Sequence, residues 1–150
     1  VIAAGGIADG RGIAAAFMLG AKAVQMGTRF VATEECNVHE NYKQFLLKAR
    51  DIDTRVTGRT TGHPVRTLRN PMTKEYLEKE AAGASFEELE MLTLGGLRKA
   101  VVDGDVKTGS VMSGQIAGMV KDVPACKDLM ARLMAETKEA VKKNSFLVEE

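Results

Sequence analysis

The sequence predicts an α/β fold, because its first segment alternates between patterns typical of a strand, a helix and a second strand. The apolar run Val1–Ala4 is typical of a short parallel strand buried on both faces. Asp9 is placed to cap a helix with its body over 12–19, and Gly20 is placed to end that helix in a left-handed conformation. Residues 23–26 have the pattern of the second strand.

The predicted helix carries Ile13, Ala16 and Phe17 on one stripe, which is the face expected to pack on the sheet. The connection between the two strands is long enough for a right-handed crossover. The two strands are therefore predicted to be parallel.

Mostly helical patterns follow this unit. The predicted elements are a helix over 39–49, an extended piece over 53–57, a Thr-, Arg- and Gly-rich loop over 58–69, a helix over 71–82, a helix over 85–102 and a last helix from Pro124. Ser85 and Glu88 are spaced as a capping box. The last helix has an apolar stripe that is predicted to pack in the core: Leu129, Met130, Leu133, Met134 and Val141.

Composition limits the classes of function. The chain has 150 residues, about one domain, with 21 Lys and Arg against 20 Asp and Glu, so nothing suggests a nucleic-acid partner. No apolar run approaches the roughly 20 residues of a membrane span. Cys36 and Cys126 are expected to be free thiols of a reducing cytoplasm. Cys36 and His39 have a metal-like spacing, but two ligands do not make a site, and no metal is predicted.

Glycines stand at the ends of both predicted parallel strands. Gly5 and Gly6 follow the first strand, and Gly27 with Thr28 follows the second. Without a Cβ atom, backbone N–H groups can approach a phosphate closely. A short helix beginning near Thr28 would favour an anion at its N-terminus. Together these turns predict a two-sided phosphate cradle, such as the loops after strands seven and eight form in (β/α)8 barrels.

Two other interpretations compete with this one. Gly10, Gly12 and Ala15 match the G-x-G-x-x-A dinucleotide fingerprint, and Glu34 and Glu35 lie about 20 residues further on. Residues 5–9 separate that fingerprint from the strand it should follow directly, which argues against a dinucleotide site. The second alternative is that the glycines only make tight turns.

Four segments together resemble one family of flavin enzymes. AAGGIADGRGIAAAFMLGAKAVQMGTRF is similar to the phosphate-binding stretch of flavin-dependent (β/α)8 barrels. VQMGTRFVATEECNVHENYK, GHPVRTLRN and GSVMSGQIAG resemble the enoyl-acyl-carrier-protein reductase II family, of which nitronate monooxygenase is a close relative. The resemblance implies strands seven and eight of such a barrel and the helical segments that follow. Its divisions would be the last two βα units over 1–36, a helical and loop excursion over 37–110, and a helical segment over 111–150 that completes the barrel.

The resemblance implies FMN as cofactor. The residues expected to bind it are Gly5, Gly6, Ile7, Gln25, Met26, Gly27 and Thr28, with Ser113, Gly114 and Gln115 near the flavin. The implied reaction is reduction of a trans-2-enoyl group on acyl carrier protein by NADH or NADPH, in bacterial fatty-acid synthesis. A monovalent cation, a cytoplasmic location and a homodimer of the complete protein are also implied.

The chain is short for such an enzyme, since a full barrel needs about 250 residues. We therefore expect a C-terminal fragment or truncated product that is incomplete and inactive alone. The family's catalytic histidine would lie before Val1, so no catalytic residue is assigned. His39 is expected to be a capping or surface residue. Nitronate monooxygenase activity, or a non-catalytic fragment that keeps the phosphate cradle, remain the alternatives.

One basic stretch is a candidate for partner recognition. Arg59, Arg66 and Arg69 surround His63, and such a run could meet an NADPH phosphate or an acidic carrier protein. A solvated surface is the more common meaning of such a run.

Overall fold

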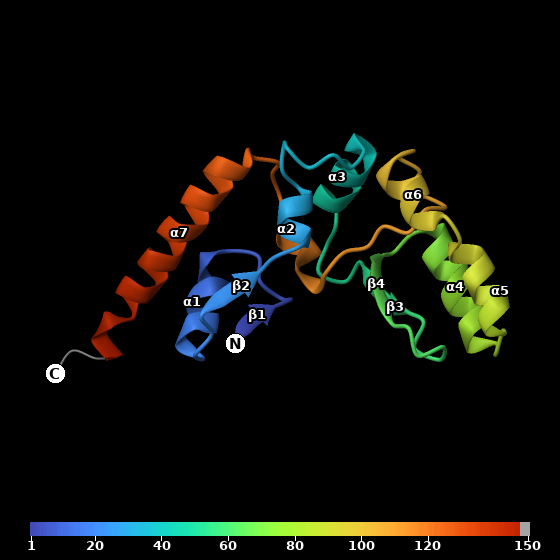
Figure 1. Ribbon diagram of the computed structural model, residues 1–150, viewed down its shortest axis with the longest axis horizontal. Coiled ribbons are helices and arrows are strands. Elements are labelled where there is room, and N and C mark those ends of the chain that lie inside the picture. The colour runs from blue at the N-terminus through green and yellow to red at the C-terminus, as the bar shows by residue number, and fades with distance from the viewer. Residues whose placement is uncertain (148–150) are drawn as a thin grey trace. The chain divides into compact units, whose positions relative to one another are not determined.

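A computed structural model describes residues 1–147 of the chain. The chain forms two compact units, which are described separately (Figure 1). The terminal unit contains Val1–Cys36 and the described part of Asp122–Glu150, and the central unit contains Asn37–Lys121. Within the described range, no helix has the length and apolar character needed to cross a membrane. The predicted divisions at 36, 110 and 150 stay predictions, and the last three residues of the third division lie outside the described residues.

Two parallel strands open the terminal unit, as the sequence predicts. β1 (Ile2–Ala4) pairs with β2 (Ala23–Gln25), so that Ala4 lies opposite Gln25. The prediction that the first strand is buried on both faces is wrong for the described structure, because Ile2 is 66% exposed. The sheet described here has two strands, so β1 has a hydrogen-bonded neighbour on one side.

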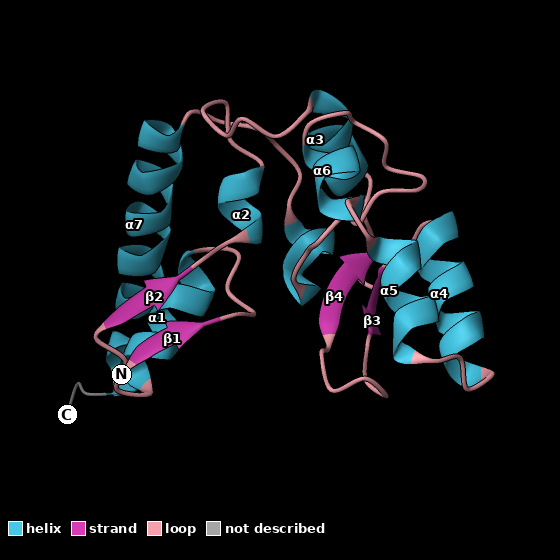
Figure 2. Ribbon diagram, turned by 45° about the vertical axis from the view of Figure 1, so that its right-hand side comes forward, coloured by secondary structure: helices cyan, strands magenta, loops and turns pink. Residues whose placement is uncertain are grey.

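Helix α1 (Gly10–Met18) connects the two strands and has both predicted capping residues, although its body begins two residues before and ends one residue before the predicted range 12–19 (Figure 2). The Asp9 carboxylate accepts hydrogen bonds from the backbone N–H groups of Arg11 and Gly12, at 3.0 and 3.2 Å. These two amides have no acceptor inside the helix, so the carboxylate fixes where the helix begins. Gly20 follows the last turn with a φ of +92°, a conformation that costs other residues about 1–2 kcal/mol.

The core of the terminal unit lies between the sheet, α1 and α7 (Cys126–Lys143). Its buried members are Ile7, Ile13, Ala16, Ala21, Leu129 and Leu133. Ile13 and Ala16 lie on the predicted stripe of α1, and Phe17 packs against the cluster while remaining partly exposed. A 3₁₀ turn, η2 (Ser145–Leu147), follows α7.

Helix α7 differs from the prediction in two respects. It begins at Cys126 rather than Pro124, because the Glu35 carboxylate caps the Cys126 N–H at 2.8 Å. Of the predicted apolar stripe, only Leu129 and Leu133 are buried, so the buried face of α7 is narrower than predicted. Three members are about half exposed in the described structure: Met130, Met134 and Val141.

The central unit is built on an antiparallel hairpin that the sequence did not predict in full. β3 (Thr54–Thr57) was expected as an extended piece, whereas β4 (Val65–Leu68) lies inside the segment 58–69 that was predicted to be a loop. That prediction is wrong for its second half. Val56 pairs with Arg66, and Thr67 forms a further bridge with Met112. Strand pairing on both edges overrides the low β-propensity of the segment's Gly and Arg residues.

Helices make up most of the remaining central unit (Figure 2). They are α3 (Glu40–Leu47), α4 (Pro71–Ala81), α5 (Phe86–Thr93), α6 (Gly96–Val101) and the 3₁₀ helix η1 (Gln115–Met119), while α2 (Thr28–Val31) belongs to the terminal unit. The Ser85–Glu88 capping box is present, as predicted. The single helix expected over 85–102 is wrong, because Gly95 has a φ of +69° and separates α5 from α6.

Buried Asn70 joins the pieces of the central unit. Its side-chain amide donates to the carbonyl oxygens of Val106 and Gly109, at 2.9 and 2.8 Å. Its side-chain oxygen accepts from the backbone N–H and the hydroxyl of Thr73, both at 2.8 Å, and thereby caps α4. Asn before Pro at the first helical position is a cap signal that the sequence analysis did not use.

Candidate phosphate-binding site

The two predicted glycine turns lie at the same edge of the parallel sheet. Ala4 and Gln25 are partners in the strand register, so the chain leaves the sheet at Gly5 on one strand and at Met26 on its neighbour. Carboxyl ends of adjacent parallel strands are where α/β proteins bind ligands. The structure thus brings together the residues predicted from the first two strands.

The backbone at both turns is open. Gly5 and Gly6 have φ angles of +80° and +73°, which are strained for any other residue type. A Cβ atom built at Gly5, Gly6 or Gly27 would meet no heavy atom within 4 Å. These glycines are therefore not required by close packing inside the described chain, and the space beside them is available to a phosphate.

The side chains next to the glycines anchor the turns. Ile7 is 8% exposed and belongs to the core cluster with Leu129 and Leu133 of α7. Met26 packs against the same cluster, whereas the predicted Gln25 is exposed. Ile7 and Met26 consequently anchor the turns to the core, and the exposed backbone of the turns is left to face a ligand.

Thr28 begins the short helix α2, as predicted, with Gly27 as its N-cap residue. The N–H groups of Phe30 and Val31 donate to the Gly27 carbonyl, at 3.0 and 3.1 Å, which closes the first turn. Helix N-termini present backbone N–H groups that have no acceptor within the helix. A hydroxyl residue and a helix start therefore lie together at this turn, as the predicted phosphate site requires.

Arg29, which the sequence analysis did not assign, is the charged residue behind this turn. Its guanidinium is 4% exposed and donates to the Asp122 carboxylate at 2.6 Å. Burial lowers the pKa of Arg29 and the Asp122 charge opposes that shift, so the group stays a cation. Hydrogen bonding to Arg132 holds the pKa of Asp122 below its usual range. The partners are 93 residues apart, so no sequence spacing could have revealed the pair.

Ser113, Gly114 and Gln115 lie in the central unit, whereas the two glycine turns belong to the terminal unit. Their backbone continues the hairpin, since the Ser113 N–H donates to the Arg66 carbonyl at 3.1 Å. Gly114 is the N-cap residue of η1, and Gln115 is exposed. Among the described residues, the Ser113 hydroxyl is buried and has no hydrogen-bond partner. A buried hydroxyl of this kind is what a bound polar group would satisfy.

His39 has the predicted capping role. His39 is the N-cap residue of α3, and its Nδ1 accepts from the Asn41 N–H at 3.0 Å. Cys36 and Cys126 are free thiols. The described residues contain no group of three or more His, Cys, Asp or Glu side chains that could hold a metal ion. The His63 ring lies 5.9 Å from the Phe86 ring in a tilted contact.

The dinucleotide alternative does not fit the structure. Gly10 and Gly12 lie inside α1 and not at the strand end. The Gly10 N–H donates to the Glu136 carboxylate at 2.9 Å, and a Cβ at Gly10 would lie 2.4 Å from the Thr137 nitrogen. Gly10 allows the start of α1 to pack closely on α7, and a Cβ at Gly12 would lie 3.3 Å from the Ile7 side chain, so both glycines have packing neighbours within the terminal unit.

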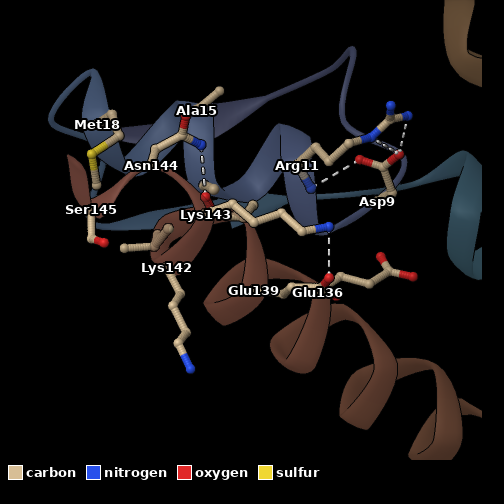
Figure 3. A pocket seen from close by; sticks show the side chains of 13 residues that line it. Asp9, Arg11, Ala15, Met18, Glu136, Glu139, Lys142, Lys143, Asn144 and Ser145 are labelled. Atoms are coloured by element: carbon tan, nitrogen blue, oxygen red, sulfur yellow. Dashed lines mark hydrogen bonds and ion pairs between the residues drawn. The ribbon is translucent and has the colours of Figure 1, made fainter. Parts of the chain in front are cut away.

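A separate hollow of about 960 Å³ lies between α1 and the second half of α7 (Figure 3). Its floor contains small side chains such as Ala14, Ala15 and Ala140, and ion pairs flank it. None of the residues predicted to bind FMN lines this hollow. The two glycine turns are thus distinct from this hollow.

The parallel strand–helix–strand unit is typical of part of an α/β barrel, and the two turns are its candidate phosphate site. A sequence profile described as nitronate monooxygenase matches residues 1–136. The chain belongs to the nitronate monooxygenase family.

Three relatives illustrate this membership. FabK from Thermotoga maritima is 51% identical with a TM-score of 0.88, and the match covers 95% of this chain and 45% of FabK. A nitronate monooxygenase of Paraburkholderia phytofirmans is 36% identical over 151 residues, covering 94% of this chain and 38% of the relative. A Mycobacterium tuberculosis protein, (3aS,4S,5R,7aS)-5-hydroxy-7a-methyl-1-oxo-octahydro-1H-indene-4-carboxyl-CoA dehydrogenase, is 32% identical over 190 residues, covering 99% of this chain and 52% of the relative.

These matches confirm the predicted family and the predicted fold class, a part of the (β/α)8 barrel. The chain spans about half the length, or less, of the relatives named above. The named curated relatives are a monooxygenase and a dehydrogenase, so the family's members are oxidoreductases.

Proposed function

We propose that the protein carrying this chain is an FMN-dependent enoyl-acyl-carrier-protein reductase that uses NADH or NADPH, and that residues of this chain bind the FMN phosphate. The observation that carries the proposal is the pair of open glycine turns at the carboxyl edge of β1 and β2. Two segments that resemble the enoyl-acyl-carrier-protein reductase II family, residues 110–118 and the stretch NVHENYK, are our reason for proposing the reductase before the monooxygenase.

In this proposal the chain's residues bind and orient the cofactor. Backbone N–H groups at Gly5 and Gly6 would face the phosphate from one side, and Gly27 with the Thr28 hydroxyl from the other. The Ser113 hydroxyl would satisfy a polar atom of the flavin. When bound, FMN supplies transfer of a hydride from NAD(P)H to the β-carbon of the enoyl thioester. A monovalent cation, a cytoplasmic location and a homodimer belong to the same proposal, and no described residue is assigned as catalytic.

Nitronate monooxygenase activity is the second candidate, because the matching family profile and the Paraburkholderia relative carry that name. The complete protein should be assayed for NADH and NADPH oxidation with a crotonyl thioester, and for O₂ uptake with a nitronate. Thioester-dependent oxidation supports the reductase, whereas nitronate-dependent O₂ uptake alone would replace it by the monooxygenase. Neither activity is expected of the third candidate, a non-catalytic fragment.

The 150-residue chain by itself is expected to bind FMN weakly, because the turns provide contacts to the phosphate and the ring needs a pocket of its own. Titration of the isolated chain with FMN, followed by flavin fluorescence, measures this. A stoichiometric yellow complex of the isolated chain would contradict the expectation.

Acyl carrier protein is the proposed partner. A hollow of about 640 Å³ in the central unit is lined by four cationic side chains and one carboxylate: Lys48, Arg50, Arg69, Lys74 and Asp53. Arg50 is paired with Asp53 at 3.0 Å, and the Arg66 guanidinium of the neighbouring strand is engaged by the Thr54 hydroxyl at 3.0 Å. Exposed Arg69 is therefore a cleaner probe of an acidic partner than Arg66.

Arg69→Glu in the complete protein should raise the KM for a carrier-bound substrate by roughly three- to tenfold and leave the KM for the coenzyme A thioester unchanged. Arg98→Glu, an exposed charge reversal that does not line the hollow, is the matched control. Equal KM values for Arg69→Glu and the parent with the carrier substrate would remove this surface from the proposal.

A further inference from the structure

Within the terminal unit, a series of charged side chains connects the residues that follow the two glycine turns. It begins at Arg29, the residue directly after Gly27 and Thr28. The buried Arg29 guanidinium reaches two acceptors of Asp122, the carboxylate at 2.6 Å and the main-chain carbonyl at 3.2 Å. A buried cation needs such a partner, because an unpaired one is strongly destabilising. Asp122 therefore determines where the start of α2 is held.

Asp122 is itself held by α7. Arg132 donates to both Asp122 carboxylate oxygens, at 2.5 and 3.3 Å. Two-point contact of a guanidinium with a carboxylate fixes orientation as well as distance. The Asp122 carboxylate thus lies between two arginines, one behind the Gly27–Thr28 turn and one on α7.

The link continues along α7 to the other turn. Glu136 lies one helical turn after Arg132, with 4.0 Å between the Arg132 Nε and one carboxylate oxygen. The second oxygen accepts from the Gly10 N–H at 2.9 Å, where α1 begins after the Gly5–Gly6 turn. Figure 3 shows Glu136 on α7 beside the start of α1, near Asp9 and Arg11. The close approach of Gly10 to the backbone of α7 makes this contact tight.

We propose that Asp122 and Glu136 are positioning residues that hold the two glycine turns at the spacing required by the phosphate of FMN. The inference rests on the proposed function. Neither side chain touches the phosphate in this proposal, since Asp122 acts through Arg29 and Glu136 acts through Gly10. Helix α7 is distant in sequence from both turns, and in this proposal its contacts align the two turns with each other.

The test compares binding of FMN with binding of riboflavin, which lacks the phosphate, to the apo form of the complete protein. A residue that aligns the phosphate turns affects FMN and not riboflavin, whereas a merely structural residue affects both. Asp122→Ala and Glu136→Ala should each lower the ratio of FMN to riboflavin affinity by about tenfold, the effect common for residues that support a ligand site. Glu136→Gln keeps an oxygen acceptor for the Gly10 N–H and should recover most of the ratio.

Lys143→Ala is the matched control. It breaks the 2.7 Å Lys143–Glu139 pair on the same helix, and that pair contacts neither turn. Its affinity ratio should equal that of the parent protein. If Asp122→Ala does not fold because Arg29 is left unpaired, Glu136→Ala decides the question alone.

The outcomes separate the inference from the proposed function. A parent protein that prefers FMN, with variants that keep this preference, would overturn the positioning role and leave the phosphate site intact. A parent protein that binds riboflavin as tightly as FMN would overturn the phosphate site and the inference together. A lowered ratio in both alanine variants, with recovery in Glu136→Gln, supports the inference.

Discussion

The glycines at the ends of β1 and β2 and two glycines of the central unit, Gly104 and Gly109, have opposite surroundings. At Gly5, Gly6 and Gly27 an added Cβ atom would meet nothing within 4 Å. At Gly104 of the central unit it would lie 2.3 Å from the His39 Nδ1, and at Gly109 it would lie 2.4 Å from the Asp105 carbonyl oxygen. Gly104 and Gly109 are required by internal packing. The strand-end glycines have no packing neighbour, and their open backbone lies at the sheet edge where we propose that the phosphate binds.

The largest effect expected from this comparison is on stability, at Gly104. Gly104→Ala places a methyl group against the His39 ring and holds alanine at a φ of +70°. Left-handed strain and overpacking together should cost about 4 kcal/mol of unfolding free energy. Denaturant unfolding, with amide exchange over 37–121 as the local readout, measures the loss. A loss under about 1 kcal/mol would mean that this glycine is not required by packing.

Asn70→Ala should be the next largest, at about 3 kcal/mol. The change removes the α4 cap and leaves the Val106 and Gly109 carbonyls without their donor. Ser85→Ala is the control, because it removes an exposed cap without carbonyl partners and should cost about 1 kcal/mol. Equal losses of unfolding free energy in the two variants would show that the hydrogen bonds donated by the Asn70 amide contribute little to stability.

Gly6→Ala should have a smaller effect on stability, about 1–2 kcal/mol, because only the left-handed φ of +73° is strained. FMN affinity of the apo protein should fall by about tenfold or more, because the methyl group points into the space proposed for the phosphate. Gly20→Ala carries the same backbone penalty in the same unit, at a φ of +92° and also without Cβ contacts. The phosphate assignment of Gly6 requires both results: FMN affinity that is reduced in Gly6→Ala and FMN affinity that is unchanged in Gly20→Ala.

The smallest effect concerns pH. The pKa of Asp122 lies below its usual 3.8, chiefly because Arg132 donates a hydrogen bond to the ionised carboxylate. On acidification the unfolded chain binds this proton first, so the contribution of Asp122 is complete above about pH 4 and is lost as pH falls through the folded pKa. Unfolding free energies measured between pH 6 and roughly pH 2.5 should fall less steeply for Asp122→Asn than for the parent. Identical slopes would contradict this assignment.

Local signals predicted the ends of the first elements well. Asp9, Gly20, Ser85 and Glu88 act on backbone groups within a few residues, and all four have the predicted role. The same holds for the phosphate turns, whose placement depends on where two short apolar strands stop. The residues that the sequence assigned to them lie at one sheet edge, although their contact with FMN stays a prediction.

The signals failed where a partner distant in sequence decides the outcome. β4 exists because Val65–Leu68 pairs with β3 on one edge and meets Met112 at the other. The predicted helix is interrupted at Gly95, and the adjacent Gly96 packs against Ser110, since a Cβ at Gly96 would lie 2.6 Å from the Ser110 hydroxyl. Neither neighbour is visible in a local window.

The sequence by itself therefore determined the family, the parallel strand–helix–strand unit and the two glycine turns, because each depends on residue type and short spacing. Only the tertiary structure decided that Asp122 and Glu136 of the C-terminal segment contact the residues that follow those turns. Their partners, Arg29 and Gly10, are 93 and 126 residues away along the chain. Electrostatic and hydrogen-bonding partners at that separation are selected by packing of α7 on α1, which no periodicity in the sequence records.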